Sequence, residues 1–369
     1  MGSAPMRIAY VVSRYLPSLG GVETHVSEIA RRVQQAGHEV EILTQREPAS
    51  DLARVEVQAG VTVRRFTTLV PSRAYPVAPG LFAHLARHGY DCVHAHNYHA
   101  LPALGAAISK RGPLVFTPHY LGGGHTLASR LAHRPYLVLG RLIFDRSDRV
   151  ICTTRAEAGL VRDRFAVRPQ VLSVIPNGVD EAAIRASEPL PVKGTVVLWA
   201  GRLERYKRAD MVVSAMRWLP RDFHLYVVGD GPARAGLEQD AQRWGLGDRV
   251  RFTGGVPHDV AYRWFRTASV FVSMSSRESF GISILEAAAA GVPVVASDIP
   301  VHREVADEYG SGNVWLVPTD ADLSALASTI ERAAQTHPPA LGSPLPSWDD
   351  AAASTLQIYR SLGCLRRGT

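Results

Sequence analysis

The chain has 369 residues, of which 46% are hydrophobic and 20% charged, and its formal net charge is +7. That length predicts two domains, each with its own core. The positive charge is spread along the chain, which disfavours a nucleic-acid-binding tail and is compatible with anionic ligands or an anionic membrane surface. No apolar run approaches the roughly 18 to 20 residues of a membrane span.

The N-terminal sequence and the cysteines favour a cytoplasmic protein. MGSAPMRIAYVVS has no secretory pattern. Cys92, Cys152 and Cys364 are odd in number, widely spaced and in no metal-type pair, which predicts reduced thiols. Lysine is rare: among 41 basic residues only Lys110, Lys193 and Lys207 are lysine.

Short apolar strands alternate with helical stretches in two blocks. The predicted strands of the first block are 7–12, 39–44, 91–95, 114–117, 149–152 and 171–175. After PNGVD at 176–180 and a stretch rich in Pro and Ala, the second block has predicted strands at 195–200, 223–228, 249–252, 270–273, 294–296 and 314–317. This βαβ rhythm predicts two doubly wound α/β domains with parallel sheets.

The predicted domains are 1–178 and 179–347. A Pro-rich segment, HPPALGSPLP, then leads to a last predicted helix at 348–362, which is too short to be a domain. In open parallel sheets ligands bind beyond the carboxyl ends of the strands, so two such domains facing each other would form one cleft.

The segment SRESFGISILEAAAAGVPVVAS places Glu278 on a loop and Glu286 inside the helix that follows it. Backbone N–H groups near Gly281, Ile282 and Ser283 lie at the positive end of that helix, where a phosphate is favoured. Carboxylates beside this site would accept hydrogen bonds from sugar hydroxyls. The competing interpretation is a surface helix with capping-type acids.

WAGRLERYKRAD sets Arg202 and Lys207 on the loop after the first strand of the second domain. A planar guanidinium and a compact ammonium together can neutralise a diphosphate leaving group. The alternative is a solvated basic loop. Arg205 or Arg208 could supply the second phosphate contact instead of Lys207.

Two glycine-rich turns are candidates for close approach to a phosphate. Gly20 and Gly21 precede an amphipathic helix in SLGGVETHVSEIA, and VVGDGPAR offers Gly229 and Gly231. Neither segment is the G-x-G-x-x-G dinucleotide fingerprint, so hydride chemistry is disfavoured.

Histidines and a D-x-D raise the question of a metal. His119 in TPHYLGGGH could hydrogen-bond a sugar, although a structural histidine is the alternative. In HAHNYH, His94 and His96 share a strand face, but no acidic base follows, so polar contacts from Asn97, Tyr98 or His99 are favoured over zinc. Asp320 and Asp322 open a helix, which favours capping. We expect no metal.

Taken together, these segments resemble the retaining glycosyltransferases of family 4, which have the two-domain GT-B fold. The resemblance rests on the Gly-Gly loop, the TPHY histidine, GRL with a following lysine, VVGDGP, ESFGISILE and the closing SWDDAAASTLQIYRSL helix. It covers nearly the whole chain. It implies that the terminal segment 348–369 crosses back onto the first domain.

The resemblance also implies roles for individual residues. Arg202 and Lys207 would hold the donor diphosphate, assisted by Gly21 and the N–H groups at Gly281 and Ile282. Glu286 would bind the ribose, Glu278 would lie against the donor sugar, and His119 would contact the sugar near the reacting carbon. The further predicted donor contacts are Gly20, Gly229, Val256, Ser279 and Phe280.

The resulting prediction is a retaining, metal-independent hexosyltransferase that uses a nucleoside diphosphate sugar. A UDP-hexose such as UDP-GlcNAc or UDP-glucose is favoured, with GDP-mannose as the alternative donor and a small molecule, glycan or lipid as acceptor. The predicted acceptor contacts are Tyr15, Asn97, Tyr98 and Tyr120. A sugar-nucleotide epimerase and a catalytically silent nucleotide-sugar-binding protein are the competing functions.

Residues 127–144 mix Arg with bulky apolar side chains. Peripheral contact with the inner face of a membrane is therefore an alternative to an ordinary helix packed on the sheet.

Overall fold

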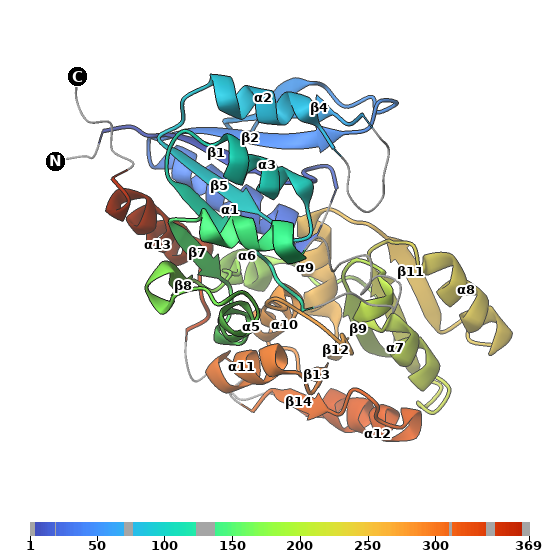
Figure 1. The fold of residues 1–369 in the computed structure, drawn as a ribbon. Coiled ribbons are helices and arrows are strands. Elements are labelled where there is room, and N and C mark those ends of the chain that lie inside the picture. The colour runs from blue at the N-terminus through green and yellow to red at the C-terminus, as the bar shows by residue number, and fades with distance from the viewer. Residues whose placement is uncertain are drawn as a thin grey trace. The chain divides into compact units, whose positions relative to one another are not determined.

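The computed structural model describes residues 4–18, 20–69, 77–122, 137–309, 312–336 and 344–363. The chain divides into two compact units, Met1–Asn177 with Trp348–Thr369, and Gly178–Ser347. In each unit helices cover a central β-sheet (Figure 1). The predicted class, two Rossmann-like α/β domains, is confirmed.

The sheet of the first unit has the strand order β3-β4-β2-β1-β5-β6-β7-β8. Its strands are β1 Arg7–Val11, β2 Glu39–Arg46, β3 Val55–Gln58, β4 Val61–Thr67, β5 Cys92–His96, β6 Leu114–Thr117, β7 Arg149–Cys152 and β8 Leu172–Val174. Its helices include α1 Gly21–Gln35, α2 Pro79–Arg87, α3 Leu101–Ser109, α5 Arg155–Phe165 and a 3-10 turn, η1 Pro169–Val171. The strand order reverses between β1 and β5, so the loops after these strands border the ligand-binding edge.

The sequence analysis missed a hairpin in this sheet. Strands β3 and β4 pair antiparallel, and β4 then pairs parallel with β2. Ala59 and Gly60 form the turn with φ of 48° and 82°. The signal was the alternation in VEVQAGVTV around a two-residue turn, which is typical of a hairpin. The expected alternation of strands and helices did not predict this hairpin, because no helix lies between β2 and β4 in the chain.

The sheet of the second unit is parallel, with the order β11-β10-β9-β12-β13-β14. Its strands are β9 Thr195–Ala200, β10 Phe223–Val228, β11 Val250–Gly254, β12 Val270–Ser273, β13 Val294–Ser297 and β14 Val314–Val317. Its helices are α6 Glu181–Ala186, η2 Arg205–Lys207, α7 Ala209–Ala215, α8 Arg234–Arg243, α9 His258–Thr267, α10 Ile282–Ala289, α11 Pro300–Tyr309 and α12 Leu323–Ala334. The order reverses between β9 and β12, as in dinucleotide-binding sheets.

The last helix, α13 Trp348–Ser361, belongs to the first unit. The Tyr359 hydroxyl donates to the Tyr10 hydroxyl at 2.8 Å and lies 2.6 Å from His94 Nδ1. Asp349 pairs with Arg32 of α1 at 2.5 Å. The predicted return of the terminal helix to the first domain is therefore confirmed.

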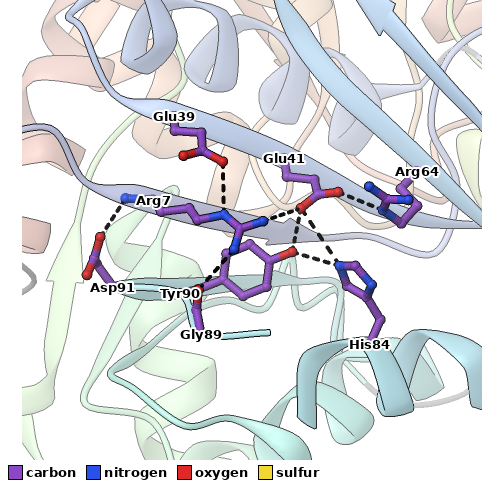
Figure 2. A network of polar contacts seen from close by, with 8 residues as sticks. All are labelled: Arg7, Glu39, Glu41, Arg64, His84, Gly89, Tyr90 and Asp91. Carbon is purple, nitrogen blue, oxygen red and sulfur yellow. Dashed lines mark hydrogen bonds and ion pairs between the residues drawn. The ribbon is translucent and has the colours of Figure 1, made fainter. Parts of the chain in front are cut away.

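A buried carboxylate organises the N-terminal ends of β1 and β2 (Figure 2). Glu41 accepts hydrogen bonds from Arg64 Nε at 2.7 Å and from the Tyr90 hydroxyl at 2.5 Å. Its Oε2 also lies 3.8 Å from His84 Nε2 and 3.6 Å from an Arg7 nitrogen. Burial raises the pKa of the Glu41 carboxyl, but the hydrogen bonds and the Arg64 charge lower it more, so the net pKa is below its usual value.

Replacing Glu41 with glutamine should lower the free energy of unfolding by about 2 kcal/mol at neutral pH, because two cations and a phenol lose a buried anionic partner. The Glu41 carboxyl has a lower pKa in the folded state, so its stabilisation is present above its unfolded pKa and is lost as the pH falls. Urea unfolding at neutral pH and near pH 4 measures this. If the difference in unfolding free energy between the wild type and Glu41→Gln grew on acidification, the lowered folded-state pKa of Glu41 would be contradicted.

Two further sequence predictions concern thiols and membrane contact. Cys92 and Cys152 are buried and form no disulfide within the described part of the chain, while Cys364 lies outside the described residues. Of the segment 127–144, residues 127–136 also lie outside them, Ile143 and Phe144 are buried, and Val138 is 74% exposed. Across the described ranges, no helix has the length and hydropathy of a bilayer-crossing segment.

Candidate functional site

The predicted donor residues of the second unit gather on the loops that follow β9 and β12, where the strand order reverses. Lys207 ends the 3-10 turn η2 after β9, and Glu278 lies on the loop between β12 and α10. The Lys207 ammonium donates to Glu278 Oε1 at 2.5 Å, with the two side chains 21% and 9% exposed. The structure therefore brings these two residues, 71 positions apart, into one ion pair.

The pair is charged on both sides. Burial lowers the pKa of Lys207, but the charge of Glu278, the charge of Tyr206 and the hydrogen bond to Glu278 together more than offset it, and the net pKa is raised. Burial likewise raises the pKa of Glu278, while the Lys207 charge and hydrogen bond bring it below its usual value. An ammonium and a carboxylate are thus held together at neutral pH.

The two loops are tied to each other through the backbone. The Tyr206 carbonyl accepts from the Ser276 amide at 2.8 Å and from the Ser276 hydroxyl at 3.1 Å. Arg202 lies close enough to the ion pair for its charge to lower the pKa of Lys207. The Arg202 Nε atom is 3.5 Å from Glu204 Oε1. Arg202 and Lys207 therefore place two cations on the segment that follows β9.

Helix α10 begins at this loop with a glycine that its conformation requires. Gly281 is the N-cap with φ of 91°, in the left-handed region that favours glycine. The first amides of the helix, from Ile282 onward, lie at the positive end of the helix dipole. The end of α10 thus provides N–H groups and partial positive charge within the same loop that carries Glu278.

Glu286 lies one turn further along α10 and is partly buried. Burial raises the pKa of its carboxyl from 4.5 to about 7. The Glu286 carboxyl therefore gains or loses its proton near neutral pH. The affinity for any ligand that hydrogen-bonds to the carboxylate should depend on pH in that range.

The other predicted donor residues have mixed positions. Gly229 follows β10 with φ of 129°, and a Cβ there would meet the Gly201 carbonyl oxygen at 1.9 Å, so the β9 and β10 loops touch only because Gly229 is a glycine. Val256 packs partly buried against the core. Phe280 is 2% exposed, so a contribution from it to donor binding would come from its backbone. Ser279 is partly exposed on the loop itself.

The sequence analysis missed His302, which lies beneath this loop. His302 is fully buried on α11, and its Nδ1 is 2.8 Å from the Ser297 carbonyl oxygen. A Cβ added to Gly281 would lie 3.8 Å from the His302 ring. Nothing in DIPVHREV distinguishes this histidine, since its proximity to Gly281 depends on the packing of α11 against α10.

In the first unit, His119 belongs to a buried group with His25 and His96. His96 Nδ1 is 3.4 Å from His119 Nε2, and the His25 ring centre lies 5.1 Å from that of His119. His25 Nδ1 is 2.7 Å from Asn177 Oδ1. Burial lowers the pKa of all three histidines, so the rings are neutral at physiological pH.

His25 and Asn177 were also missed by sequence reasoning. GVETHVSE predicted only an amphipathic helix, and PNGVD marked only a boundary. The predicted neighbours of His119 are placed as follows. His94 and His96 share one face of β5, as expected, with ring centres 4.2 Å apart. His94, however, is engaged by Thr117 and Tyr359.

The four predicted acceptor residues do not form one surface. Tyr98 is fully buried and Tyr120 is 3% exposed, both in the hydrophobic core, so their positions favour packing over acceptor contact. Tyr15 is 6% exposed. Asn97 has φ of 70° and accepts from the His99 amide at 3.1 Å, which shapes the loop after β5.

Two remaining candidates are resolved by local structure. Helix α1 begins at Gly21, directly after Gly20. Asp322 is the N-cap of α12 and accepts from the Ser324 amide at 3.2 Å, so the predicted capping is confirmed for Asp322, while the role of Asp320 stays a prediction.

Two Rossmann-like units, one with cations and a helix N-terminus at its switch point, have the architecture of GT-B glycosyltransferases. Residues 19–183 match the Glycosyltransferase Family 4 domain, and residues 180–338 match the Glycosyl transferases group 1 domain. The chain is 30% identical over 381 residues to a D-inositol 3-phosphate glycosyltransferase of Xylanimonas cellulosilytica, covering 92% of this chain and 91% of the relative. It therefore belongs to the family of GT-B glycosyltransferases that join these two domains.

Other comparisons agree. A D-inositol 3-phosphate glycosyltransferase of Streptomyces avermitilis is 31% identical, covering 92% of this chain and 82% of the relative. Sucrose-phosphate synthase from Thermosynechococcus elongatus superposes with a TM-score of 0.76 at 23% identity, over 96% of this chain and 98% of that one. Anabaena HepE, solved with UDP-glucose, has a TM-score of 0.73 at 20% identity, over 97% and 98% of the two chains. The two structures show a shared fold.

Proposed function

We propose that the protein transfers a hexosyl group from a nucleoside diphosphate sugar to an acceptor hydroxyl, with retention of configuration and without a metal ion. The observation that carries the proposal is the Lys207–Glu278 ion pair beside the N-terminus of α10, with Arg202 close by. This arrangement supplies positive charge for a diphosphate and a carboxylate for a sugar on one pair of loops.

The proposed chemistry divides the site by charge. Glycosyl transfer passes through an oxocarbenium-like state in which the bond from the anomeric carbon to the phosphate oxygen breaks while the bond to the acceptor oxygen forms. Arg202, Lys207 and the amides of α10 would stabilise the departing diphosphate. Glu278, kept ionised by Lys207, would face the sugar, Glu286 would accept from the ribose hydroxyls, and the neutral His119 ring would hydrogen-bond the sugar.

Two routes to retention remain to be distinguished. In a front-face route the leaving phosphate oxygen takes the proton of the acceptor hydroxyl, and no covalent intermediate forms. In a double displacement Glu278 would attack the anomeric carbon first. We favour the front-face route because Lys207 occupies one Glu278 oxygen in this structure.

For the donor we favour a UDP-hexose, of the UDP-glucose or UDP-GlcNAc type, with GDP-mannose as the alternative. Support comes from HepE, which shares the fold and was solved with UDP-glucose. For the acceptor, the relatives named D-inositol 3-phosphate glycosyltransferase point to a phosphorylated cyclitol as the first compound to try. Tyr15 and Asn97 are the proposed acceptor contacts, and a cytoplasmic location fits such substrates.

The test combines these donors with inositol 3-phosphate and with simple sugar acceptors. Release of nucleoside diphosphate that depends on an acceptor, with the α configuration of the donor kept in the product, seen by NMR as an equatorial anomeric proton, would support retaining transfer. Conversion of the nucleotide sugar without acceptor would indicate an epimerase. Tight donor binding with no turnover in any combination would indicate a silent binding protein.

The metal-free step gives a separate prediction. Excess EDTA should change the initial rate by less than about twofold, because the fixed cations and helix dipole neutralise the leaving diphosphate. Activity that disappears with EDTA and returns with Mg²⁺ or Mn²⁺ would contradict metal independence.

A further inference from the structure

Three buried histidines from three different elements meet in the first unit. His25 lies on α1, His96 ends β5, and His119 follows β6. One ring nitrogen from each lies within 4.8 Å of the other two, and among the described residues this is a group that could hold a metal ion. Their exposed fractions are 4%, 0% and 6%.

The spacing of the rings matches metal coordination. Zn²⁺ binds imidazole nitrogen at about 2.0 to 2.1 Å, so two ligands on a tetrahedron are about 3.4 Å apart and their ring centres about 5 Å apart. His96 Nδ1 and His119 Nε2 are 3.4 Å apart. The three ring centres are separated by 5.4 Å, 5.1 Å and 5.6 Å. The planes of His96 and His119 differ by 24°.

The hydrogen bonding of the group suits metal ligation. The Asn177 Oδ1 atom can only accept a hydrogen bond, so His25 Nδ1 carries the proton. The Nε2 atom of the neutral His25 ring is then unprotonated and has a lone pair. A metal-binding histidine usually donates its other N–H to such a partner, which fixes the ring. Burial keeps the three rings neutral, as ligation requires, and neutral imidazoles bind a metal without losing a proton.

Three further observations concern the individual histidines. His94, next to His96, has both nitrogens engaged, by Tyr359 and Thr117. In the described structure, His96 Nε2 is buried without a hydrogen-bond partner, while its Nδ1 is the nitrogen that lies 3.4 Å from His119 Nε2. His119 has φ of 47°, a backbone conformation that is uncommon for a residue with a Cβ and that the surrounding structure must impose.

We propose that His25, His96 and His119 form a binding site for one transition-metal ion of the Zn²⁺ type, with water as a fourth ligand. The metal plays no part in the proposed transfer. If that proposed function is correct, a bound ion would occupy the His119 ring and inhibit transfer. Metal binding itself does not depend on the proposed function.

The experiment measures Co²⁺ and Zn²⁺ binding to the full-length chain without a histidine tag. Co²⁺ titration should give one equivalent with the intense visible absorption of a tetrahedral site, and Zn²⁺ should displace it in competition with a chromogenic chelator. No nucleotide sugar is present, so a negative result here leaves the proposed transferase function untouched.

His119→Asn is the main variant, because asparagine tolerates the left-handed backbone and lacks the imidazole. It and His25→Gln should each weaken Zn²⁺ binding by more than about 100-fold, and Asn177→Ala by about 10- to 100-fold. Asn177 is not a ligand, so its variant still tests the site should a histidine variant fail to fold by circular dichroism.

His88→Gln is the matched control. His84 and His88 have stacked rings 4.0 Å apart near the end of α2, and His88 is exposed, so this pair is a competing surface chelate. The control should retain the tetrahedral Co²⁺ spectrum and the Zn²⁺ affinity. The proposal is overturned if the wild type gives no tetrahedral spectrum, if His88→Gln abolishes binding, or if folded His119→Asn and Asn177→Ala bind like the wild type.

Discussion

Lys207→Ala is expected to lower kcat/KM by about 100- to 1,000-fold, which is the usual effect of removing one preorganised group that stabilises transition-state charge. The ammonium pairs with Glu278 in the structure and would be shared with the diphosphate as the glycosidic bond breaks. Steady-state kinetics with the preferred donor measure the effect. The loss should appear mainly in kcat, because the charge on the leaving group is greatest in the transition state.

Lys193→Ala is the matched control for Lys207→Ala. Lys193 is an exposed lysine of the same unit, so its removal changes the net charge equally without touching the site. Its kinetics should match the wild type. Because Lys207→Ala also leaves Glu278 without its cation, thermal unfolding of both variants must be compared. A folded Lys207→Ala protein with kcat/KM within threefold of the wild type would refute the proposed role of Lys207.

The second large effect concerns Glu286 and pH. With its pKa raised by burial to about 7, the Glu286 carboxyl changes charge within the working range of most enzymes. It would be about nine-tenths ionised at about pH 8 and about one-tenth at about pH 6. If the ribose hydroxyls donate to the carboxylate, the donor Kd should increase by up to about tenfold between those pH values. Calorimetric titration with a nucleotide sugar, whose diphosphate does not titrate there, measures this.

Glu286→Gln separates the charge of Glu286 from its shape. At about pH 8 this variant should bind the donor about 10- to 100-fold more weakly, since hydrogen bonds to a charged group contribute more than neutral ones. Its Kd should not change with pH. A wild-type Kd that likewise does not change with pH would contradict the predicted ribose contact. A Glu286→Gln variant that binds the donor like the wild type at about pH 8 would also contradict it.

The raised pKa of the Glu286 carboxyl also predicts how the stability of the folded protein changes with pH. The folded-state pKa of about 7 is above the ordinary value of 4.5, so protonation favours the folded state and stability is lost as the pH rises through about 7. Without donor, Glu286→Gln should therefore become more stable than the wild type between about pH 5 and pH 8, by up to about 3 kcal/mol. This provides a check on the pKa that needs no substrate.

Local sequence patterns were sufficient for most of the architecture. Apolar strands such as 195–200 and 270–273, each followed by a loop and a helix, predicted two parallel sheets, and the sheets place loops at the carboxyl ends of β9 and β12. Lys207 and Glu278 could both be placed at the ligand-binding edge because each follows a strand of one parallel sheet, whereas the adjacency of β9 and β12 is seen only in the structure. The hairpin β3–β4 was missed because its alternating pattern interrupts the βαβ rhythm without a helix.

The missed residues depend on packing between distant segments. His302 approaches Gly281 only through the contact of α11 with α10, and His25 of α1 meets His119 on the loop after β6 only through tertiary packing. Tyr98 and Tyr120 were predicted as acceptor contacts because they lie on loops after strands, but both rings turn into the core. A loop position predicts which edge of the sheet a residue lies on, and the direction of its side chain depends on tertiary packing.

The most direct test of the central claim, that the loops after β9 and β12 bind a nucleoside diphosphate without metal, is calorimetric titration of UDP and GDP into the wild type and Lys207→Ala with EDTA present. We expect the wild type to bind one of the two nucleotides selectively, with a Kd that EDTA does not change. The Kd of Lys207→Ala for that nucleotide should be at least about tenfold higher. Equal binding to both proteins, or no binding of either nucleotide by the wild type, would contradict it.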